Sequence, residues 1–342
     1  MTATDDDAFL YLTATQVAEL CREIDLLDTV TSAFLAVRAG RAEIAPEAAL
    51  RWTAPDGTAA RSLMLPARYT ASYGCKIINA CVGNPARGLP RAHGLIMLFD
   101  PETAAPACLL EAAHISALRT AAVSVAALRA VRELSAVRSV AFLGCGRQAY
   151  THLQLLGTRA SPETVIAYDV HAGRAAGFAE QVRQLLPRAT VTVTDGPEAA
   201  VRGADITIAA TTTTTPYVAL DWMRPGAVFV NVSLDDATEE LLLGCERLFV
   251  DDWSLVSEDQ TRLLGRLARA GRVTGPGGTP PPGGRSVDAD LADLLADACP
   301  GQVTEADRAV INPFGMGVHD IALAAQVYSA ASASGVGHWL PR

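Results

Sequence analysis

This chain of 342 residues contains a single lysine, Lys76. The other 27 of its 28 Lys and Arg residues are arginines. The chain is also rich in Ala, Gly and Pro, as a GC-rich coding bias produces, and such a bias replaces lysine by arginine wherever either would serve. A desolvated lysine can lose its proton, whereas a guanidinium cannot. Lys76 is therefore a candidate for proton transfer, and the alternative is a chance survivor on the surface.

A glycine-rich segment, Gly144-x-Gly146-x-x-Ala149, separates a predicted strand from a predicted helix. In a dinucleotide-binding fold the first glycine makes a tight turn, the second admits the pyrophosphate, and a small third residue lets the helix pack closely. The phosphates bind N–H groups at the helix N-terminus. Asp169 ends the next strand, 23 residues after Gly146, where a carboxylate accepts hydrogen bonds from ribose hydroxyls. The carboxylate also repels a 2′-phosphate, which favours NAD over NADP. The alternative is a glycine turn without a ligand.

Two polar loops follow later strands of the same region. The threonines at 211–215 follow one predicted strand, and Ser233-Leu234-Asp235-Asp236 follow the next. Ligands bind at the carboxyl ends of parallel strands. One of the two adjacent carboxylates is a candidate general acid or base beside a nicotinamide. The alternatives are a polar surface loop for the threonines and a helix N-cap for either aspartate.

Composition excludes several classes of protein. The formal charge is 28 minus 37, or −9, without a basic block, so we expect no nucleic-acid or anionic-membrane partner. No apolar run approaches the roughly 20 residues that span a bilayer. Residues 1–7 carry three aspartates and no basic residue, unlike a signal peptide. Seven scattered cysteines and six histidines show no ligand spacing, so we expect no metal and a cytoplasmic protein with free thiols.

The elements that position these residues form two groups. In the middle of the chain strands alternate with helices, which predicts a parallel sheet with right-handed crossovers. The predicted strands are 137–143, 164–168, 190–194, 206–210, 227–233 and 247–250, and the predicted helices are 150–156, 175–186 and 198–202.

The first 130 residues favour a mixed, mostly antiparallel sheet. One helix is predicted over 16–39, extended segments over 48–53, 59–65, 75–80 and 94–99, and a long helix over 116–134. Residues 275–284 are a surface loop by composition, and helices follow at 288–298 and 315–331. The fold class is therefore α/β, with a Rossmann-type doubly wound parallel sheet over 126–311 and a second α+β domain from 1–125 and 312–342.

Several segments together resemble the ornithine cyclodeaminase/mu-crystallin family. They are YGCKIINACVGNPARGLPRAHG around Lys76, HISALRTAA around Arg119, GCGRQA, VNVSLDD and PFGMGVHDIALAAQVY, and they cover nearly the whole chain in the family's order. Within the family, GLPRA (88–92), VSLDD (232–236), VDDW (250–253) and NPFGMG (312–317) resemble the dehydrogenases of 2,3-diaminopropionate biosynthesis. Those enzymes oxidise N-(1-amino-1-carboxy-2-ethyl)glutamate with NAD and hydrolyse the imine to 2,3-diaminopropionate and 2-oxoglutarate.

The resemblance implies a role for each matching residue. Arg51 and Lys76 would bind the substrate carboxylate, and Arg119 would contact the substrate. Lys76 would lie nearest the reacting carbon, and Asp236 would be the proton acceptor. The implied NAD-binding residues are Arg119, Thr120, Gly144, Gly146, Arg147, Gln148, Ala149, Asp169, Thr211, Thr212, Ser233, Leu234, Asp235 and Phe314. The resemblance also implies a small amino-acid substrate, which the domain of residues 1–125 and 312–342 would bind. It implies a homodimer built through the sheet of that same domain.

Other activities remain open. Cyclodeaminases carry Gly-Gly-Asp where this chain has Leu234-Asp235-Asp236, which disfavours ornithine or lysine cyclisation. Alanine dehydrogenase and ketimine reductase are alternatives in the same class. A nucleotide-binding protein without catalysis, as in crystallin-like relatives, and a purely structural dimer module are alternatives of other classes.

Overall fold

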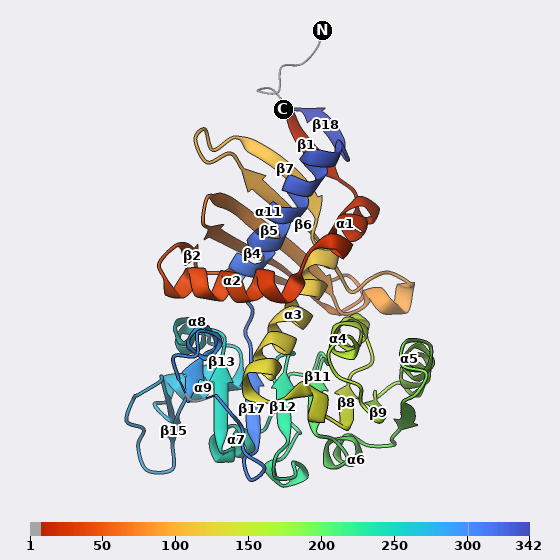
Figure 1. Ribbon diagram of the computed structural model, residues 1–342, viewed down its shortest axis with the longest axis vertical. Helices are drawn as coiled ribbons and strands as arrows, with labels where there is room; N and C mark the ends of the chain where they lie inside the picture. Colours follow the sequence, from red (N-terminus) through yellow and green to blue (C-terminus); the bar gives the residue numbers. More distant parts are fainter. Residues whose placement is uncertain (1–7, 300) are drawn as a thin grey trace. The chain divides into compact units, whose positions relative to one another are not determined.

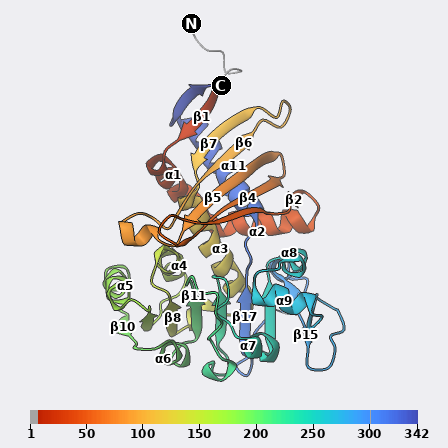
Figure 2. The same ribbon diagram turned by 180° about the vertical axis from the view of Figure 1, so that it is seen from behind.

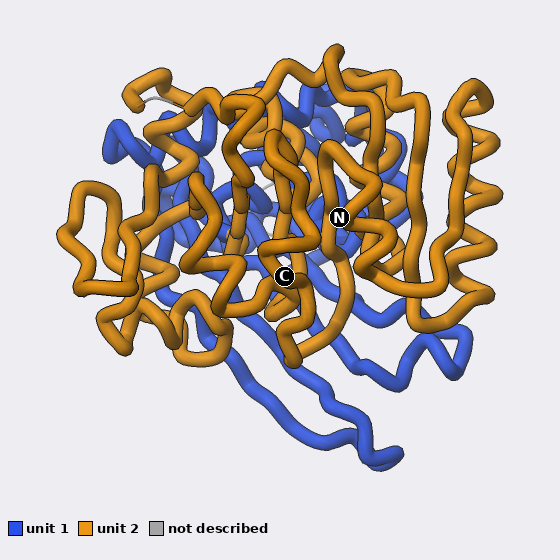
Figure 3. Tube along the Cα trace, turned by 90° about the horizontal axis from the view of Figure 1, so that it is seen from below, with its two compact units in different colours: residues 1–119, 316–342 blue, residues 120–315 orange. Residues whose placement is uncertain are grey.

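The computed structural model describes residues 8–299 and 301–342, and these form two compact units (Figure 3). Unit 1 comprises the described residues up to Arg119 together with Met316–Arg342, and unit 2 comprises Thr120–Gly315. The acidic stretch at 1–7 lies outside the described residues.

Unit 1 is built on one mixed sheet in the order β18-β1-β7-β6-β5-β4-β2, with β3 paired to β4. Its strands are β1 (Ala8–Leu12), β2 (Ala42–Ile44), β3 (Ala48–Thr53), β4 (Ala59–Tyr69), β5 (Ser72–Cys81), β6 (Ala92–Phe99), β7 (Pro106–Glu111) and β18 (His338–Pro341). Only the β1–β7 pair is parallel in this sheet. The mixed, mostly antiparallel sheet agrees with the prediction, although β1, β2, β7 and β18 were not predicted.

The single helix predicted over 16–39 is wrong. The segment forms α1 (Ala14–Leu20), a short 3₁₀ turn and α2 (Leu26–Arg38). Asp25 breaks the helix because its carboxylate accepts hydrogen bonds from the N–H groups of Leu27 and Asp28, at 3.1 and 3.0 Å. A side chain that caps a new helix in this way competes with continuation of the preceding one.

Helix α11 (Gly317–Ser334) packs on the face formed by β4 and β5. It lies in front of the strands in Figure 1, and the strands lie in front of it in the opposite view of Figure 2. Two glycines permit this close approach. A Cβ on Gly74 would lie 2.8 Å from Cδ1 of Ile321, and one on Gly317 would lie 3.0 Å from the carbonyl oxygen of Leu65. Neither position tolerates a side chain without displacing α11 from the sheet.

Unit 2 contains an eight-stranded, wholly parallel sheet in the order β10-β9-β8-β11-β12-β17-β13-β16. The strands are β8 (Ser139–Leu143), β9 (Thr164–Tyr168), β10 (Thr190–Val193), β11 (Ile206–Ala209), β12 (Val228–Asn231), β13 (Arg247–Val250), β16 (Ala289–Asp290) and β17 (Ala309–Asn312). The run β10-β9-β8-β11-β12 has the strand order 3-2-1-4-5 of a Rossmann fold, which confirms the predicted fold class. The unpredicted strand β17 inserts between β12 and β13.

The helices of this unit join the parallel strands. They are the part of α3 (Ala113–Val131) beyond Arg119, α4 (Arg147–Gly157), α5 (Ala172–Leu185), α6 (Pro197–Arg202), α7 (Glu239–Gly244), α8 (Trp253–Glu258), α9 (Leu263–Arg269) and α10 (Leu291–Leu295). The helix predicted over 288–298 is therefore shorter, because its first residues pair with β13 as strand β16. Two-residue strands β14 (Val273–Thr274) and β15 (Arg285–Ser286) close the predicted loop at 275–284. Among the described residues, no helix is long and apolar enough to cross a membrane.

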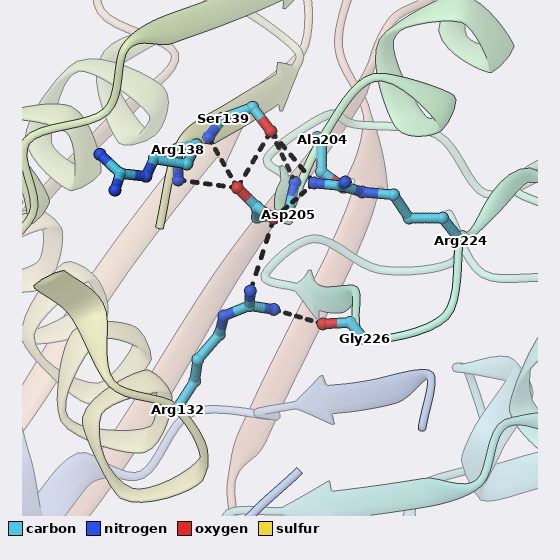
Figure 4. A network of polar contacts seen from close by, with 7 residues as sticks. All are labelled: Arg132, Arg138, Ser139, Ala204, Asp205, Arg224 and Gly226. Carbon is cyan, nitrogen blue, oxygen red and sulfur yellow. Dashed lines mark hydrogen bonds and ion pairs between the residues drawn. The ribbon is translucent and has the colours of Figure 1, made fainter. Parts of the chain in front are cut away.

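Asp205 fastens the amino ends of the parallel strands, as Figure 4 shows. Its carboxylate accepts the N–H groups of Arg138 and Ser139, at 2.7 and 2.8 Å, and pairs with the guanidinium groups of Arg132 and Arg224. Burial by itself would raise the pKa of Asp205, but these N–H groups and cations outweigh it and lower the pKa. The network is structural, at the opposite end of the strands from the predicted nucleotide loops.

Candidate functional site

In unit 1, Lys76 lies in the middle of β5, paired with Leu65 on β4 and Ile96 on β6. Its side chain is fully buried. The Nζ atom donates to Oδ2 of Asp320 at 2.6 Å and to Oγ of Ser116 at 3.5 Å. The lone lysine is therefore not a chance surface residue, because a buried ammonium persists only where hydrogen-bonding partners are in place.

Asp320, which the sequence analysis did not single out, is the carboxylate that Lys76 contacts. The face of α11 that meets the sheet carries Gly317, Asp320 and Ile321, at the i, i+3 and i+4 spacing of one helix face. The close approach allowed by Gly317 brings Asp320 to Lys76, and its Oδ1 also accepts from Nε of Arg119 at 3.3 Å. One buried carboxylate thus pairs with both cations. The available signal was an acid in the first turn of a helix made of small apolar residues.

The pKa of Lys76 is lowered from 10.5 to about 8. Burial is the largest cause and the positive charge of Arg119 is the second, while Asp320 and Glu47 act in the opposite direction. A lysine with such a pKa is partly deprotonated near neutral pH, so it can both attract a carboxylate and exchange a proton.

Arg51, the third residue predicted to bind substrate, is exposed on β3. It is in register with Arg61, which is in register with Ala80 on β5. Directly paired residues share a face of a sheet, and Ala80 is four residues from Lys76 on β5. Arg51 therefore lies on the same face of the sheet as Lys76. The structure brings Lys76 and Arg119 together around Asp320, and it leaves Arg51 at a distance from them.

In unit 2, the glycine-rich segment has the geometry that phosphate binding requires. Gly144 follows β8 with a φ of +84°, and a Cβ there would lie 2.8 Å from the carbonyl oxygen of Ala210. Gly146 precedes α4 without a side-chain cap, and a Cβ on it would meet nothing within 4 Å. Ala149 is buried, and Oε1 of Gln148 is buried without a hydrogen-bond partner in the described part of the chain. A helix N-terminus that follows two glycines fits a diphosphate.

Asp169 follows β9, beside the glycine-rich turn. Its Oδ2 accepts the N–H of Cys145 at 2.9 Å and its Oδ1 accepts the N–H of His171 at 2.9 Å. These bonds fix the carboxylate at the carboxyl end of the strand, where the ribose of a dinucleotide lies in this fold.

Asp236 is surrounded by hydroxyl groups. Thr211 and Tyr217 donate to its Oδ1 at 2.7 and 3.0 Å, and Ser233 donates to its Oδ2. Burial raises the pKa of Asp236 above its usual value, and the three hydroxyl donors only partly oppose that shift. Thr211 and Ser233 were predicted as NAD-binding residues and not as partners of Asp236, and Tyr217 was not singled out, because its contact with Asp236 depends on a loop conformation.

The structure separates the two adjacent aspartates. Asp235 accepts the N–H of Leu263 at the start of α9, at 2.6 Å, and forms an ion pair with Arg266. The alternative that one of the pair caps α7 is wrong, because the Thr238 hydroxyl caps that helix itself. The Asp235 carboxylate is thus engaged with α9, and Asp236 faces the hydroxyl cluster.

The remaining predicted residues occupy different settings. The Arg262 guanidinium lies over the Phe314 ring, 4.2 Å from its centroid, and the Phe314 N–H donates to Asp251 at 2.9 Å. The loop that contains Phe314 is thus held by Arg262 and Asp251, neither of which was predicted as a site residue. Thr120 lies within α3 and Arg147 is exposed at the start of α4; Thr212 is exposed and Leu234 is half-buried. Among residues 8–299 and 301–342, no group of three or more His, Cys, Asp or Glu side chains could hold a metal ion.

Comparison with known proteins places this fold in a family. The chain is 30% identical over 269 residues to N-((2S)-2-amino-2-carboxyethyl)-L-glutamate dehydrogenase of Staphylococcus aureus, covering 78% of this chain and 77% of the relative. The crystal structure of CmnK superposes with a TM-score of 0.89 at 35% identity, covering 98% of each chain. An archaeal alanine dehydrogenase dimer with bound NAD shares the fold, with a TM-score of 0.81 at 24% identity over 97% of this chain and 99% of that one. The sequence model of the ornithine cyclodeaminase/mu-crystallin family matches residues 8–335, and the chain belongs to that family.

Proposed function

We propose that this chain is an NAD-dependent oxidoreductase that acts on the C–N bond of an N-substituted amino acid. The observation that carries the proposal is the buried pair of cations, Lys76 and Arg119, held by one carboxylate of α11. An amino-acid substrate brings a carboxylate, which a guanidinium binds in a planar, two-point geometry. The titratable lysine beside it supplies proton transfer.

The glycine-rich segment and Asp169 are the residues that would hold NAD. The helix N-terminus at Gly146, where a Cβ would meet nothing within 4 Å, fits the diphosphate, and the Asp169 carboxylate fits the ribose. The chemistry that NAD supplies when bound is acceptance of a hydride.

The chain's own residues would orient the substrate and move protons. Arg119 and Lys76 bind the carboxylate, so that Cα loses a hydride and the attached nitrogen loses a proton, which gives an imine. Water then adds to the imine carbon, and the C–N bond breaks to release an oxo acid and an amine. Lys76 or Asp236 accepts the proton of the attacking water and returns a proton to the leaving nitrogen.

For the substrate, we propose the conjugate of glutamate with 2,3-diaminopropionate. The name of the Staphylococcus aureus relative and the VSLDD and NPFGMG segments support it. The products would be 2,3-diaminopropionate, as a precursor for a siderophore or an antibiotic, and 2-oxoglutarate. Cyclodeaminase, alanine dehydrogenase and ketimine reductase activities are the alternatives, and a nucleotide-binding protein without catalysis is the alternative of another class.

The test is NADH formation, followed by absorbance, with NAD and four parallel substrates: the glutamate conjugate, ornithine, lysine and alanine. We expect NADH and 2-oxoglutarate from the conjugate alone. Ammonia release from ornithine or lysine without accumulation of NADH would identify a cyclodeaminase instead. Tight NAD binding without turnover of any substrate would favour the non-catalytic alternative.

Asp169 is expected to determine the preference for NAD over NADP. In Asp169→Ser the ribose loses a charged acceptor, and a hydrogen bond to a charged group contributes about 1.5–3 kcal/mol. We expect the KM for NAD to rise about 10- to 100-fold and the KM for NADP to fall, because the repulsion of the 2′-phosphate is removed. Steady-state kinetics with both nucleotides measures this, and an unchanged ratio of the two KM values would show that another residue selects the cofactor.

We also propose that the chain forms a homodimer through the sheet of unit 1. Met64, Ile77 and Leu95 are 38, 40 and 42% exposed. Met64 is in register with Ile77 and Ile77 with Leu95, so the three form one apolar row across β4, β5 and β6. A contiguous apolar row on a sheet face is typical of an interface between subunits.

Leu95→Arg should therefore shift the protein from dimer to monomer. A buried, unpaired guanidinium at a symmetric interface occurs twice and is strongly unfavourable. Light scattering after gel filtration should give a mass near 35.8 kDa for this variant and twice that for the wild type. Val193→Arg, at an exposed apolar position on β10 of unit 2, is the matched control and should leave the wild-type mass unchanged.

A further inference from the structure

The carboxylate of Asp320 divides its two oxygens between two cations. Oδ2 lies 2.6 Å from Nζ of Lys76, and Oδ1 lies 3.3 Å from Nε of Arg119. The Asp320 side chain is completely buried, and its backbone is held against the sheet by the close contact of Gly317 with Leu65. The two oxygens of the buried Asp320 carboxylate therefore fix the positions of both cations.

We propose that Asp320 is a positioning residue that keeps Lys76 charged and turns Arg119 so that its Nη edge is presented to the substrate carboxylate. Asp320 binds Arg119 through Nε, and this leaves the two terminal nitrogens for a second carboxylate. The assignment of that second carboxylate to a substrate rests on the proposed function, whereas the effect of Asp320 on Lys76 does not.

The charge balance around Lys76 gives the direction of the effect. Arg119 on α3 acts on Lys76 with a positive charge. Asp320 on α11 and, as the smallest contribution, Glu47, which precedes β3, act on it with negative charges. His319, the neighbouring residue on α11, is neutral because burial lowers its pKa to about 3. Asp320 is therefore the one buried counter-charge among these groups. Without Asp320, burial and the charge of Arg119 would lower the pKa of Lys76 almost unopposed.

Since Lys76 is the only lysine of the chain, its charge state can be measured directly. Protein labelled with lysine carrying ¹³C at Cε gives one side-chain resonance, and the dependence of its shift on pH reports the pKa of Lys76 without substrate or turnover. We expect the wild-type midpoint near pH 8. In Asp320→Asn it should fall by about 1 to 3 pH units, the usual effect of losing an adjacent opposite charge.

Asp205→Asn is the matched control, because Asp205 is also a carboxylate that pairs with two cations, here Arg132 and Arg224 in the structural network of unit 2. Asp205→Asn should lower the melting temperature and leave the Lys76 midpoint unchanged. If Asp320→Asn does not fold, Arg119→Gln provides the second variant: with the positive charge removed and Asp320 retained, the midpoint should rise above that of the wild type. An unmoved midpoint in Asp320→Asn would overturn the proposal, and an unmoved midpoint in Arg119→Gln would contradict the charge balance around Lys76 on which it rests.

Kinetics then test the positioning of Arg119. In Asp320→Asn at pH 7 the KM of the anionic substrate should rise at least about tenfold, because Lys76 is neutral and Arg119 is free to rotate. A purely structural role would lower the melting temperature without moving the midpoint. A moved midpoint in a protein that turns over none of the four substrates would contradict the proposed function and leave the effect of Asp320 on Lys76 established.

Discussion

Lys76→Met is expected to reduce kcat/KM by about 10²- to 10⁴-fold, the usual contribution of a positioned acid or base. Methionine has nearly the length of lysine and fills the same buried space, but it carries no charge and no exchangeable proton. Asp320 keeps Arg119 as its partner in this variant, so the carboxylate is not left alone. The dissociation constant for NAD should stay within about threefold, because the glycine-rich segment and Asp169 are unaltered. Calorimetric titration of NAD and steady-state kinetics measure the two quantities.

Lys76→Arg separates the two tasks of this residue. Arginine keeps the positive charge but does not release its proton near neutral pH. If proton transfer is the task, Lys76→Arg should be nearly as inactive as Lys76→Met, and the ionisation near pH 8 should disappear from its pH profile. Wild-type turnover in Lys76→Arg would reduce the role to charge alone, and wild-type turnover in Lys76→Met would exclude any catalytic role.

The parallel sheet of unit 2 could be predicted because its information is local. Buried parallel strands appear as short continuous apolar runs, and the glycine turn and the acid after the second strand follow at fixed spacings. The strands at 164–168 and 247–250 have the predicted bounds. The two-residue strands were not predicted, because so short a segment becomes a strand only through the neighbours it pairs with. Strand β17 was also missed, although with four residues it is as long as β13.

The candidate site was predicted only in part, for the same reason. Lys76, Arg119 and Asp236 stood out by residue type and by resemblance. Asp320 lies 244 residues from Lys76 in the sequence, and only the packing of α11 on β5 brings them together. Tyr217 reaches Asp236 through the folding of a loop. Such contacts depend on the tertiary structure, and the hydrophobic periodicity of a single segment does not predict them.

Asp236→Asn should lower kcat by about 10²- to 10⁴-fold if Asp236 is the proton acceptor. The amide keeps the size of the carboxylate, its oxygen can still accept from Thr211 and Tyr217, and the Ser233 hydroxyl can turn to accept from the amide nitrogen. The loop should therefore keep its shape, and NAD should bind as in the wild type. If Asp236 only braces this loop, the variant should keep most of its turnover, so the size of the loss decides between the two roles.

The pH profile gives the second criterion. Burial raises the pKa of Asp236, so a wild-type enzyme that needs the ionised carboxylate should lose activity as pH falls through that raised pKa. Burial also raises the pKa of Asp290, at the end of β16, to about 6, so Asp290 is a second carboxylate whose ionisation could produce an acidic limb. The acidic limb should therefore persist in Asp290→Asn and vanish in Asp236→Asn. Disappearance of the limb in Asp290→Asn instead would move the essential ionisation to β16, and it would leave the hydroxyl cluster around Asp236 as a brace for the loop.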